Sequence, residues 1–400
     1  MRVLHVVGCY PPATEWGGLP AAVASFARAL PLAGVECEVF TTTGRGSRTL
    51  PRIEPATRDV NGTRVTYFRA PDVFRSFVAP GLLPALARRV REFDLVHVHM
   101  LWAFPGIAAA RAAEWAGVPY AVSPHGALDP WSLTQWPRMK SAFLFFAEDR
   151  TLRRASFVHF TASAEQQVAP PSYRELPAEI VANVVDPEPF AAIGLAGRRA
   201  KSKDVLILGR IHRMKGFDLL VPAMREVRRR VPGARVVVAG PDEGGYRAEV
   251  ERLARELGVG DAVHFAGHLE APARARALED AAVLAMPSYR ENFGLSAAEA
   301  MAAGLPVVVS DKVNICEEIA SAGAGRVVPL DPAVLGAALA ELLLDPHGRL
   351  RMGEAGRALV RERYAPARVG AELRAAYERA IVRSTPRGGT RTMLDARRVR

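Results

Sequence analysis

A short run in the second half of the chain places two cations at a strand-to-helix turn. It reads Gly209-Arg210-Ile211-His212-Arg213-Met214-Lys215-Gly216 and leads into a helix that we expect to begin near Asp218. The start of a helix offers free N–H groups and a partial positive charge, so Arg210 and Lys215 would complete an anion site there, suited to a diphosphate. It is not a Walker loop, because the glycine spacing is absent. Taken alone, the run favours the anion site, with two solvated surface charges as the alternative.

A second run contains two glutamates with seven residues between them. It reads Glu291-Asn292-Phe293-Gly294-Leu295-Ser296-Ala297-Ala298-Glu299 and continues as a helical pattern. Ser296 and Glu299 have the spacing of a capping box, which predicts that Glu299 caps this helix. A cap does not account for Glu291, which stands before a glycine-containing turn. A carboxylate there would offer two acceptor oxygens for charge-assisted hydrogen bonds from sugar hydroxyls, and Glu299 could serve both roles.

The elements that must position these residues alternate between short apolar runs and longer helical patterns. This alternation predicts an α/β protein with parallel sheets covered by helices. The expected strands form two series, each long enough for a doubly wound sheet, with a hinge at 186–203 where prolines and glycines gather. The first series lies near residues 2–8, 35–41, 63–69, 94–99, 119–123, 156–161 and 178–183, and the second near 204–210, 234–240, 261–267, 281–287, 305–310 and 325–329.

Two loops of the first half also follow expected strands. Gly17-Gly18 comes after the first strand, and Ser123-Pro124-His125-Gly126 begins at the last residue of the strand expected at 119–123. Ligands of doubly wound sheets gather beyond the C-terminal ends of the strands. We therefore expect these loops and the two charged runs to line binding sites.

Length and composition are those of a soluble globular enzyme. A chain of 400 residues exceeds what one core supports, so two domains are expected. The longest apolar runs, such as 281–287, are far shorter than the roughly 20 residues of a membrane helix. The apolar run at 3–7 resembles a first strand rather than a secretory signal, so we expect a cytoplasmic protein. Three cysteines, at positions 9, 37 and 316, predict neither a disulfide framework nor a metal site.

The formal net charge of +11 indicates attraction to polyanions or anionic lipid headgroups. Part of it lies in the tail at 384–400, which we interpret as a flexible basic extension. The stretch 138–154 mixes arginines with apolar residues in a helical pattern, and could either rest on an anionic membrane or dock on its own sheet. A nucleic-acid-binding protein is a further hypothesis, but the arginines are scattered, so no specific nucleic acid is expected.

Together these motifs resemble those of one enzyme family. The runs GRIHRMKGFDLL and ENFGLSAAEAMAAGLPVVVSD are similar to those of the retaining glycosyltransferases of family 4, which have the GT-B fold. The resemblance covers nearly the whole chain, and includes the Gly17-Gly18 and His125 loops. It departs at 183–186, which read Asn-Val-Val-Asp instead of the family's Asn-Gly-Val-Asp.

The resemblance implies two Rossmann-like, doubly wound domains facing a central cleft. We expect an acceptor-binding domain at 1–185, joined by a C-terminal helix at 366–383. A domain at 186–365 would bind the donor, a nucleotide-diphosphate sugar. The acceptor would be a glycan or a lipid-linked molecule, with a role in surface polysaccharide synthesis.

The resemblance also implies roles for individual residues. Arg210 and Lys215 would bind the diphosphate, Glu299 the ribose, and Glu291 the hydroxyls of the transferred sugar. His125 would lie near the donor sugar and the acceptor, and Gly18 would let the backbone approach the phosphate. The catalytic set would be His125, Glu291, Arg210 and Lys215, and the donor site Gly17, Gly18, Arg210, Lys215, Glu291, Asn292, Phe293, Gly294, Leu295 and Glu299.

The leaving group determines the expected chemistry. A departing nucleotide diphosphate gathers negative charge, and the sequence has no Asp-x-Asp triplet that would hold a divalent metal. We therefore expect Arg210, Lys215 and the helix after Gly294 to stabilise that charge, with no metal or cofactor. The family likeness implies retention of configuration. Because no carboxylate partner is evident in the His125 loop, we expect the leaving phosphate oxygen, rather than a side chain, to act as the base.

Acceptor recognition would fall to the first half. Trp131 and Trp136 lie close to His125 in the sequence, and could either contact a sugar ring or fill the core. An alternative enzyme is a sugar-nucleotide epimerase or hydrolase of the same architecture. The side chains do not indicate whether the donor carries uridine, guanosine or adenosine.

Overall fold

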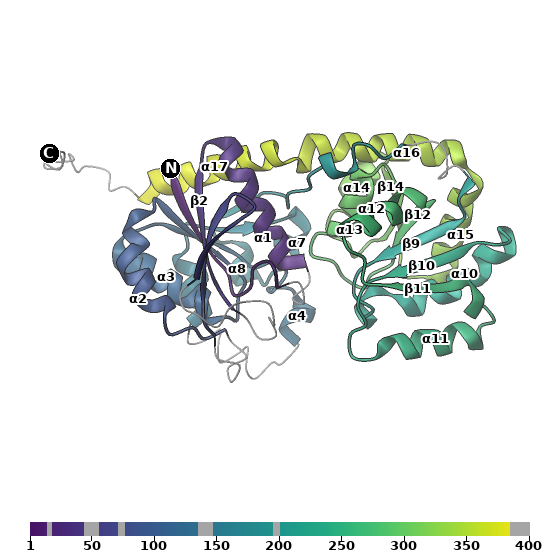
Figure 1. Ribbon diagram of the computed structural model, residues 1–400, viewed down its shortest axis with the longest axis horizontal. Coiled ribbons are helices and arrows are strands. Elements are labelled where there is room, and N and C mark those ends of the chain that lie inside the picture. Colours follow the sequence, from purple (N-terminus) through teal and green to yellow (C-terminus); the bar gives the residue numbers. More distant parts are fainter. Residues whose placement is uncertain (14–17, 44–55, 71–76, 135–146, 195–200, 385–400) are drawn as a thin grey trace, which may run out of the picture.

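The computed structural model describes residues 1–13, 18–43, 56–70, 77–134, 147–194 and 201–384. These residues form two sheet-and-helix lobes that lie side by side (Figure 1). The C-terminal helices α16 (Pro346–Leu359) and α17 (Pro366–Ser384) run along one side of both lobes. The predicted α/β class is confirmed.

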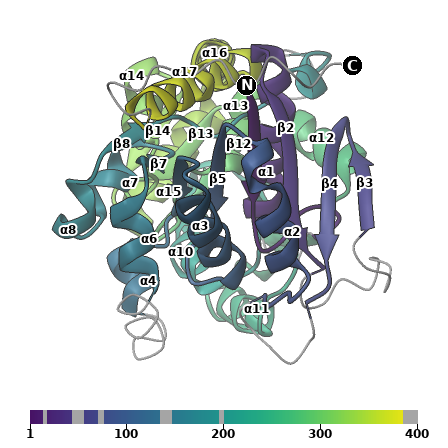
Figure 2. The same cartoon turned by 90° about the vertical axis from the view of Figure 1, so that its left-hand side faces the viewer.

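The first lobe is built on an eight-stranded sheet in the order β3-β4-β2-β1-β5-β6-β7-β8. Figure 2 shows this lobe from its end, with β3 and β4 at one edge and β8 at the other. All seven predicted strands are present within a few residues of their expected bounds. The strands are β1 (Arg2–Val6), β2 (Glu36–Thr42), β3 (Ala56–Val60), β4 (Thr63–Phe68), β5 (Leu95–His99), β6 (Tyr120–Ser123), β7 (Phe157–Phe160) and β8 (Ala178–Ile180).

The edge strand β3 corrects the expectation of a purely parallel sheet. It pairs antiparallel with β4, and all the other neighbours in this sheet are parallel. The turn between β3 and β4 is Asn61-Gly62, and both residues have positive φ, 53° and 80°. Asn-Gly flanked by apolar residues is a strong hairpin signal, so the turn could have been found in the sequence.

The second lobe has a six-stranded, parallel sheet in the order β11-β10-β9-β12-β13-β14. Here all six predicted strands are found. They are β9 (Asp204–Leu208), β10 (Arg235–Ala239), β11 (Val263–Gly267), β12 (Val283–Met286), β13 (Val307–Ser310) and β14 (Gly325–Val328).

Helices cover both sheets, because successive strand residues point to opposite faces and both faces are apolar. In the first lobe, α1 and α17 cover the face that carries Val3 and Leu95, while α2 and α3 cover the face of Leu4 and Val96. The helices of the first lobe are α1 (Gly18–Ala29), α2 (Leu82–Arg89), α3 (Phe104–Ala116), α4 (Pro130–Thr134), α6 (Asp149–Arg154), α7 (Ser163–Val168) and α8 (Pro171–Arg174), and the later ones are α10 (Phe217–Arg230), α11 (Tyr246–Glu256), α12 (Ala271–Asp280), α13 (Leu295–Ala302), α14 (Cys316–Ala322), α15 (Pro332–Leu344), α16 (Pro346–Leu359) and α17 (Pro366–Ser384).

The strand orders locate the crevice of each sheet. β1 lies between β2 and β5, and β9 lies between β10 and β12, so the chain changes direction across the sheet at both strands. Loops that leave such a strand diverge to opposite sides, which opens a crevice beyond its C-terminal end. The loops after β1 and β9 therefore border the places where ligands are expected.

The chain passes from one core to the other near residue 185. Val184 packs in the core of β1, α1 and α17, whereas Val185 and Ile193 pack in a core of the second lobe. Helix α17 returns to the first lobe, where Leu373 and Tyr377 are fully buried. We keep 185 as the proposed domain boundary.

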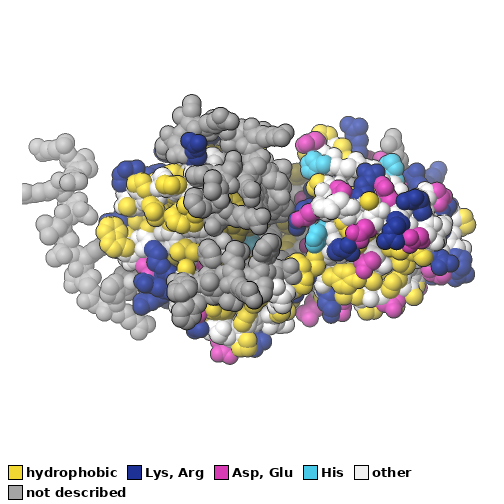
Figure 3. Space-filling view, turned by 90° about the horizontal axis from the view of Figure 1, so that it is seen from below, with side chains coloured by type: hydrophobic (Ala, Val, Ile, Leu, Met, Phe, Trp, Pro, Cys, Tyr) yellow, Lys and Arg dark blue, Asp and Glu magenta, His cyan; other side chains and the backbone are white. Residues whose placement is uncertain are grey.

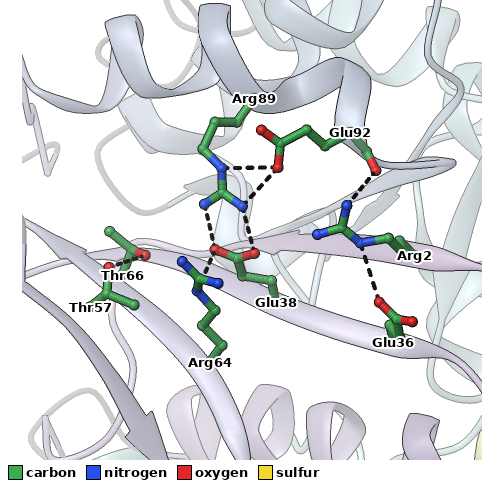
Figure 4. A network of polar contacts seen from close by, with 8 residues as sticks. All are labelled: Arg2, Glu36, Glu38, Thr57, Arg64, Thr66, Arg89 and Glu92. Atoms are coloured by element: carbon green, nitrogen blue, oxygen red, sulfur yellow. Dashed lines mark hydrogen bonds and ion pairs between the residues drawn. The ribbon is translucent and has the colours of Figure 1, made fainter. Parts of the chain in front are cut away.

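A polar network ties α2 to the first sheet (Figure 4). Arg89 of α2 donates to both oxygens of Glu38 on β2, at 2.6 and 2.9 Å, and also to Glu92. Arg64 of β4 approaches the same Glu38 carboxylate. Glu38 is almost fully buried, so this bidentate pairing satisfies its charge and orients the helix.

The surface seen in Figure 3 shows Lys and Arg side chains interspersed with Asp and Glu over the second lobe. None of the three cysteines, which all lie in the described part of the chain, forms a disulfide there. Among the residues that the structure describes, no helix combines the length and the apolar character needed to cross a membrane. In the basic stretch 138–154, the described part is 147–154, which contains α6. Leu152 of this helix is buried, and its Arg150 pairs with Glu114. This part docks on its own lobe, and contact with a membrane stays a prediction.

Candidate active site

A cleft of about 590 Å³ lies between the lobes, beyond the C-terminal ends of β1 and β9. Both lobes contribute to its walls, and most of the residues singled out from the sequence are among them. The first lobe provides Pro11, Ala13, Gly18, Leu19, Pro20, Ala21, Ala22, His125 and Asn183, and the second provides Leu208, Gly209, Arg210, Lys215, Ala239, Gly240, Pro241, His268, Leu269, Arg274, Glu291, Asn292, Phe293, Gly294, Leu295, Ser296 and Glu299.

Lys215 and Glu291 meet inside this cleft. Lys215 ends a short 3₁₀ turn that the His212 ring caps by accepting a hydrogen bond from the Met214 N–H. The Lys215 ammonium donates to the Glu291 carboxylate, and the two side chains are only 19% and 17% exposed. The predicted cation is therefore present, but in the ligand-free protein a carboxylate neutralises it.

The loop that carries Glu291 is hydrogen-bonded to the loop that follows β13. The Glu291 N–H donates to the Lys312 carbonyl, and the Asn314 N–H donates to the Glu291 carbonyl, both at 3.2 Å. The Ser288 hydroxyl also donates to the Glu291 carboxylate at 3.1 Å. These bonds fix Glu291 from both sides, so its carboxylate faces the cleft on a rigid support.

Glu299 has a cationic partner that the sequence reading missed. Arg274, on α12, donates to the Glu299 carboxylate, and both side chains line the cleft. Burial raises the pKa of Glu299, and Arg274 opposes that shift. The position of Arg274 depends on how α12 packs, so no local sequence signal marked it.

The capping-box prediction is wrong. Helix α13 begins after Gly294 without a side-chain cap, and the Ser296 hydroxyl donates to the Leu208 carbonyl at 3.1 Å instead. Glu299 is thus free of the capping role and turns to Arg274. The bare N-terminus of α13 leaves its N–H groups toward the cleft, as an anion site requires.

Arg210 is less enclosed than Lys215. Its guanidinium pairs with Glu243 at 2.5 Å, and the two side chains are 47% and 45% exposed. Both predicted cations line the cleft, but a solvent-screened Arg210 contributes less electrostatic energy than the mostly buried Lys215.

The His125 loop forms the opposite wall. His125 has a φ of 50°, an uncommon backbone conformation for a residue with a side chain. The buried Glu165 carboxylate holds the loop, because it accepts from the N–H groups of Gly126 and Thr161 at 2.7 Å. The Asn292 amide donates to the Thr161 hydroxyl at 3.2 Å and so links the two lobes beside the cleft. A carboxylate therefore does support this loop, although none was evident from the sequence.

The remaining predicted residues lie in different parts of the structure. Gly18 lies against Leu295 across the cleft, and a Cβ at Gly18 would be 3.3 Å from the Leu295 side chain. Phe293 packs its ring against Tyr364 in the core under the loop. Trp131 is 45% exposed, so it does not fill the core, and it is not among the described residues that line the cleft. Gly17 and Trp136 lie outside the described residues.

Comparisons with known proteins identify the family of this chain. Residues 196–359 match the family model described as glycosyl transferases group 1, and residues 17–172 match the glycosyl transferase 4-like domain. The chain is 31% identical over 382 residues to D-inositol 3-phosphate glycosyltransferase from Kineococcus radiotolerans, with 86% of each chain covered. This chain belongs to the family 4 glycosyltransferases. This chain is also 30% identical to 2-deoxystreptamine glucosyltransferase from Streptomyces kanamyceticus, with 88% of this chain and 91% of the relative covered.

Solved structures show the same fold. Sucrose-phosphate synthase from Thermosynechococcus elongatus superposes with a TM-score of 0.76 at 21% identity, and covers 96% of this enzyme and 100% of the synthase. HepE from Anabaena, in complex with UDP-glucose, gives a TM-score of 0.72 at 18% identity, with 95% and 100% covered. The predicted GT-B fold, two Rossmann-like domains facing a cleft, is confirmed.

Proposed function

We propose that this glycosyltransferase transfers a sugar from a nucleoside diphosphate donor to an acceptor hydroxyl with retention of configuration. One observation carries the proposal: the two glutamates, each held by a cation, line the same cleft as the bare N-terminus of α13. Such a cleft offers acceptors for sugar and ribose hydroxyls and positive charge for a diphosphate.

The donor would exchange partners with the ion pairs on binding. Its diphosphate takes the Lys215 ammonium, the α13 N–H groups and, at the rim, Arg210. Glu291, released from Lys215, then accepts from hydroxyls of the sugar, while Glu299 accepts from the ribose with Arg274 behind it. The site binds a donor that carries both negative charge and hydroxyls, because each released group finds a new partner.

Catalysis would rest on stabilising the leaving diphosphate, which gathers charge as the glycosidic bond breaks. Lys215 and α13 are fixed before the reaction, so they need no reorganisation in the transition state. The leaving phosphate oxygen takes the proton of the acceptor hydroxyl. We propose that no metal is needed, and therefore that turnover persists in excess EDTA at a rate close to that without it.

The acceptor would bind against the first lobe, on the side of the cleft that faces the donor site. The relatives' names include a cyclitol phosphate and an aminocyclitol as acceptors, so a screen begins with such polyols and includes glycans and lipid-linked sugars. The predicted role in surface polysaccharide synthesis stays a proposal. An assay with UDP-, GDP- and ADP-sugars separates transfer, which needs an acceptor, from epimerisation, which makes a new sugar nucleotide without one.

Replacement of Glu299 by glutamine tests the ribose assignment. Loss of a charge-assisted hydrogen bond costs about 1.5–3 kcal/mol, so we expect nucleoside diphosphate binding to weaken roughly 10- to 100-fold. Calorimetry with UDP, GDP and ADP measures the change. Glu279→Gln, at an exposed position near the end of α12, is the matched control and should bind like the wild type. Equal affinities in both variants would exclude Glu299 from the nucleotide site.

The stereochemical part has its own test. With the identified donor and acceptor, ¹H NMR of the product during the first turnovers should show the anomeric configuration of the donor sugar. A product of inverted configuration would contradict retention but leave the donor assignment intact.

A further inference from the structure

A group of buried histidines lies directly beneath the candidate active site. His5 on β1, His97 and His99 on β5 and His159 on β7 are each at most 1% exposed. The His97-x-His99 spacing puts both rings on one face of β5, and His5 faces His97 across the β1–β5 ladder. The rings pack against each other under α1 and α17, beside Phe26 and Tyr377.

One chain of hydrogen bonds through this group has a single direction. His159 Nε2 lies 2.8 Å from the Val181 carbonyl, which can only accept, so Nε2 carries the proton. Burial keeps the ring neutral, because it lowers the pKa of His159 to about 4. His159 Nδ1 therefore accepts from the Ser123 hydroxyl at 2.7 Å.

The same direction continues to Tyr377. The Ser123 oxygen accepts from His97 Nε2 at 2.7 Å, which leaves His97 Nδ1 to accept from the Tyr377 hydroxyl at 2.6 Å. Every polar atom named in this chain has a partner, and none of them lines the cleft. Its role is to hold β5, β6 and β7 to α17.

A second chain, separate from the first, leads into the cleft. His5 Nδ1 lies 2.8 Å from His99 Nε2, and His99 Nδ1 lies 3.0 Å from His125 Nε2. A neutral imidazole carries one proton on its two nitrogens, so the three rings must donate in the same direction to make both bonds. Either all the protons point toward His125, or all point toward His5.

The buried end of the second chain favours one direction. His5 Nε2 is buried and has no hydrogen-bond partner among the residues that the structure describes. If the protons pointed toward His5, this nitrogen would be a buried, unpaired N–H, the kind of group that folded proteins almost never leave. With the protons directed toward His125, only a lone pair is left there. His125 Nε2 then accepts, and its Nδ1 carries the proton, on a residue that lines the cleft.

The structure assigns His99 and His5 as positioning residues that hold His125 as a neutral hydrogen-bond donor, with Nδ1–H available to an oxygen of the bound donor or acceptor. This inference rests on the proposed function for what occupies the cleft, but not for the tautomer. His125 is then not the base that deprotonates the acceptor, which agrees with a phosphate oxygen in that role.

A metal ion is the competing explanation for the cluster, since one nitrogen each of His5, His97 and His99 lies within 4.8 Å of the others. Two observations argue against it. The His5–His99 separation of 2.8 Å is that of a hydrogen bond, and both nitrogens of His97 already have partners in Ser123 and Tyr377. The imidazoles therefore use their nitrogens on one another and on hydroxyls.

NMR of the full-length protein labelled with ¹⁵N-histidine reads the tautomer without any substrate. Two-bond ¹H–¹⁵N correlations distinguish Nδ1–H from Nε2–H rings, and the signals that vanish in His125→Asn identify His125. We expect His125 as the Nδ1–H tautomer in the wild type at neutral pH. An Nε2–H ring, or stoichiometric zinc or another transition metal in the purified protein, overturns the inference.

The matched pair His99→Asn and His99→Leu tests the effect on turnover. Asparagine and leucine are similar in size, but only asparagine keeps an N–H donor near the position of His99 Nδ1. We expect kcat to fall about 10- to 100-fold in His99→Leu, the range known for loss of the hydrogen-bond partner of a metal-bound histidine, with nucleotide affinity unchanged. His99→Asn should retain most of the activity and the Nδ1–H tautomer of His125.

Equal losses in the two His99 variants, with the His125 tautomer unchanged in both, would overturn the positioning role. His159→Gln, in the first chain, is the control and should leave the His125 tautomer as it is. If the wild type consumed no sugar nucleotide, the proposed function would fail, yet the NMR result on the free protein would still decide the tautomer.

Discussion

Replacement of Lys215 by alanine is expected to lower the rate of sugar transfer about 10²- to 10³-fold, because a preorganised charge at the leaving group typically contributes about 3–4 kcal/mol. The Lys215 side chain is 19% exposed, so solvent screens its charge only weakly. Its removal also leaves the Glu291 carboxylate unpaired beside the incoming diphosphate, which adds repulsion. Steady-state kinetics with the identified donor measure the loss as a change in kcat/KM.

The control for Lys215 lies two residues earlier. Arg213 is 68% exposed, pairs with Glu249 at 2.6 Å and does not line the cleft. Arg213→Ala removes the same unit of charge from the same turn, and we expect less than about a twofold change, as for most exposed ion pairs. Similar losses in the two variants would show that net charge near the loop matters, and not the Lys215 contact.

Arg210→Ala should lower kcat/KM by less than Lys215→Ala and by more than Arg213→Ala. The sequence alone assigns Arg210 and Lys215 the same role, binding of the diphosphate. In the structure, Arg210 is about half exposed and held by Glu243, so its charge is screened more strongly. A larger loss in Arg210→Ala than in Lys215→Ala would mean that the diphosphate lies nearer the rim of the cleft than we propose.

Gly216→Ala is expected to cost the second lobe about 2–5 kcal/mol of stability, combining left-handed backbone strain with overpacking. Gly216 has a φ of 69°, and a Cβ there would lie 2.1 Å from the Pro287 carbonyl oxygen. That oxygen belongs to backbone, so either the turn that carries Lys215 or the loop that carries Glu291 must move. The Lys215–Glu291 pair would separate, and nucleoside diphosphate binding would weaken as well.

Differential scanning calorimetry with and without a nucleoside diphosphate measures both effects. For a lobe of this size the melting temperature of its transition should fall by roughly 5–15 °C. Gly233→Ala is the matched control, because Gly233 has a φ of 82° but nothing lies within 4 Å of the added Cβ. The control carries only the backbone strain, so equal shifts in the two variants would rule out the contact with Pro287.

The strands were predictable because their signal is local. Apolar runs such as Val205–Leu208 and Val307–Val309 are buried on both faces of parallel sheets, and such runs are readable in any window of a few residues. The same locality placed Arg210, Lys215 and Glu291 at strand ends, where ligands gather in this kind of sheet. The hairpin at Asn61-Gly62 was readable too, but its strand is short and polar, so it was missed.

The partners of these residues were not predictable, because each contact joins separate strands or helices. Lys215 and Glu291 are 76 positions apart, and His5 and His99 are 94 apart. Strand order and register bring them together, and both arise from the packing of the whole core. The local pattern even misled at Ser296 and Glu299, whose capping-box spacing gave way to contacts with Leu208 and Arg274.

The amino-acid sequence by itself determined the family, the two sheets and the loops that border the cleft, since these follow from neighbouring positions along the chain. Only the tertiary structure determined the pairing of Lys215 and Arg210 with carboxylates, the role of Arg274 and the direction of the hydrogen bonds from His5 through His99 to His125. Those depend on which polar atoms are left without water when distant segments meet. Burial makes each such atom take the partner within reach, and the linear order does not say which partner that is.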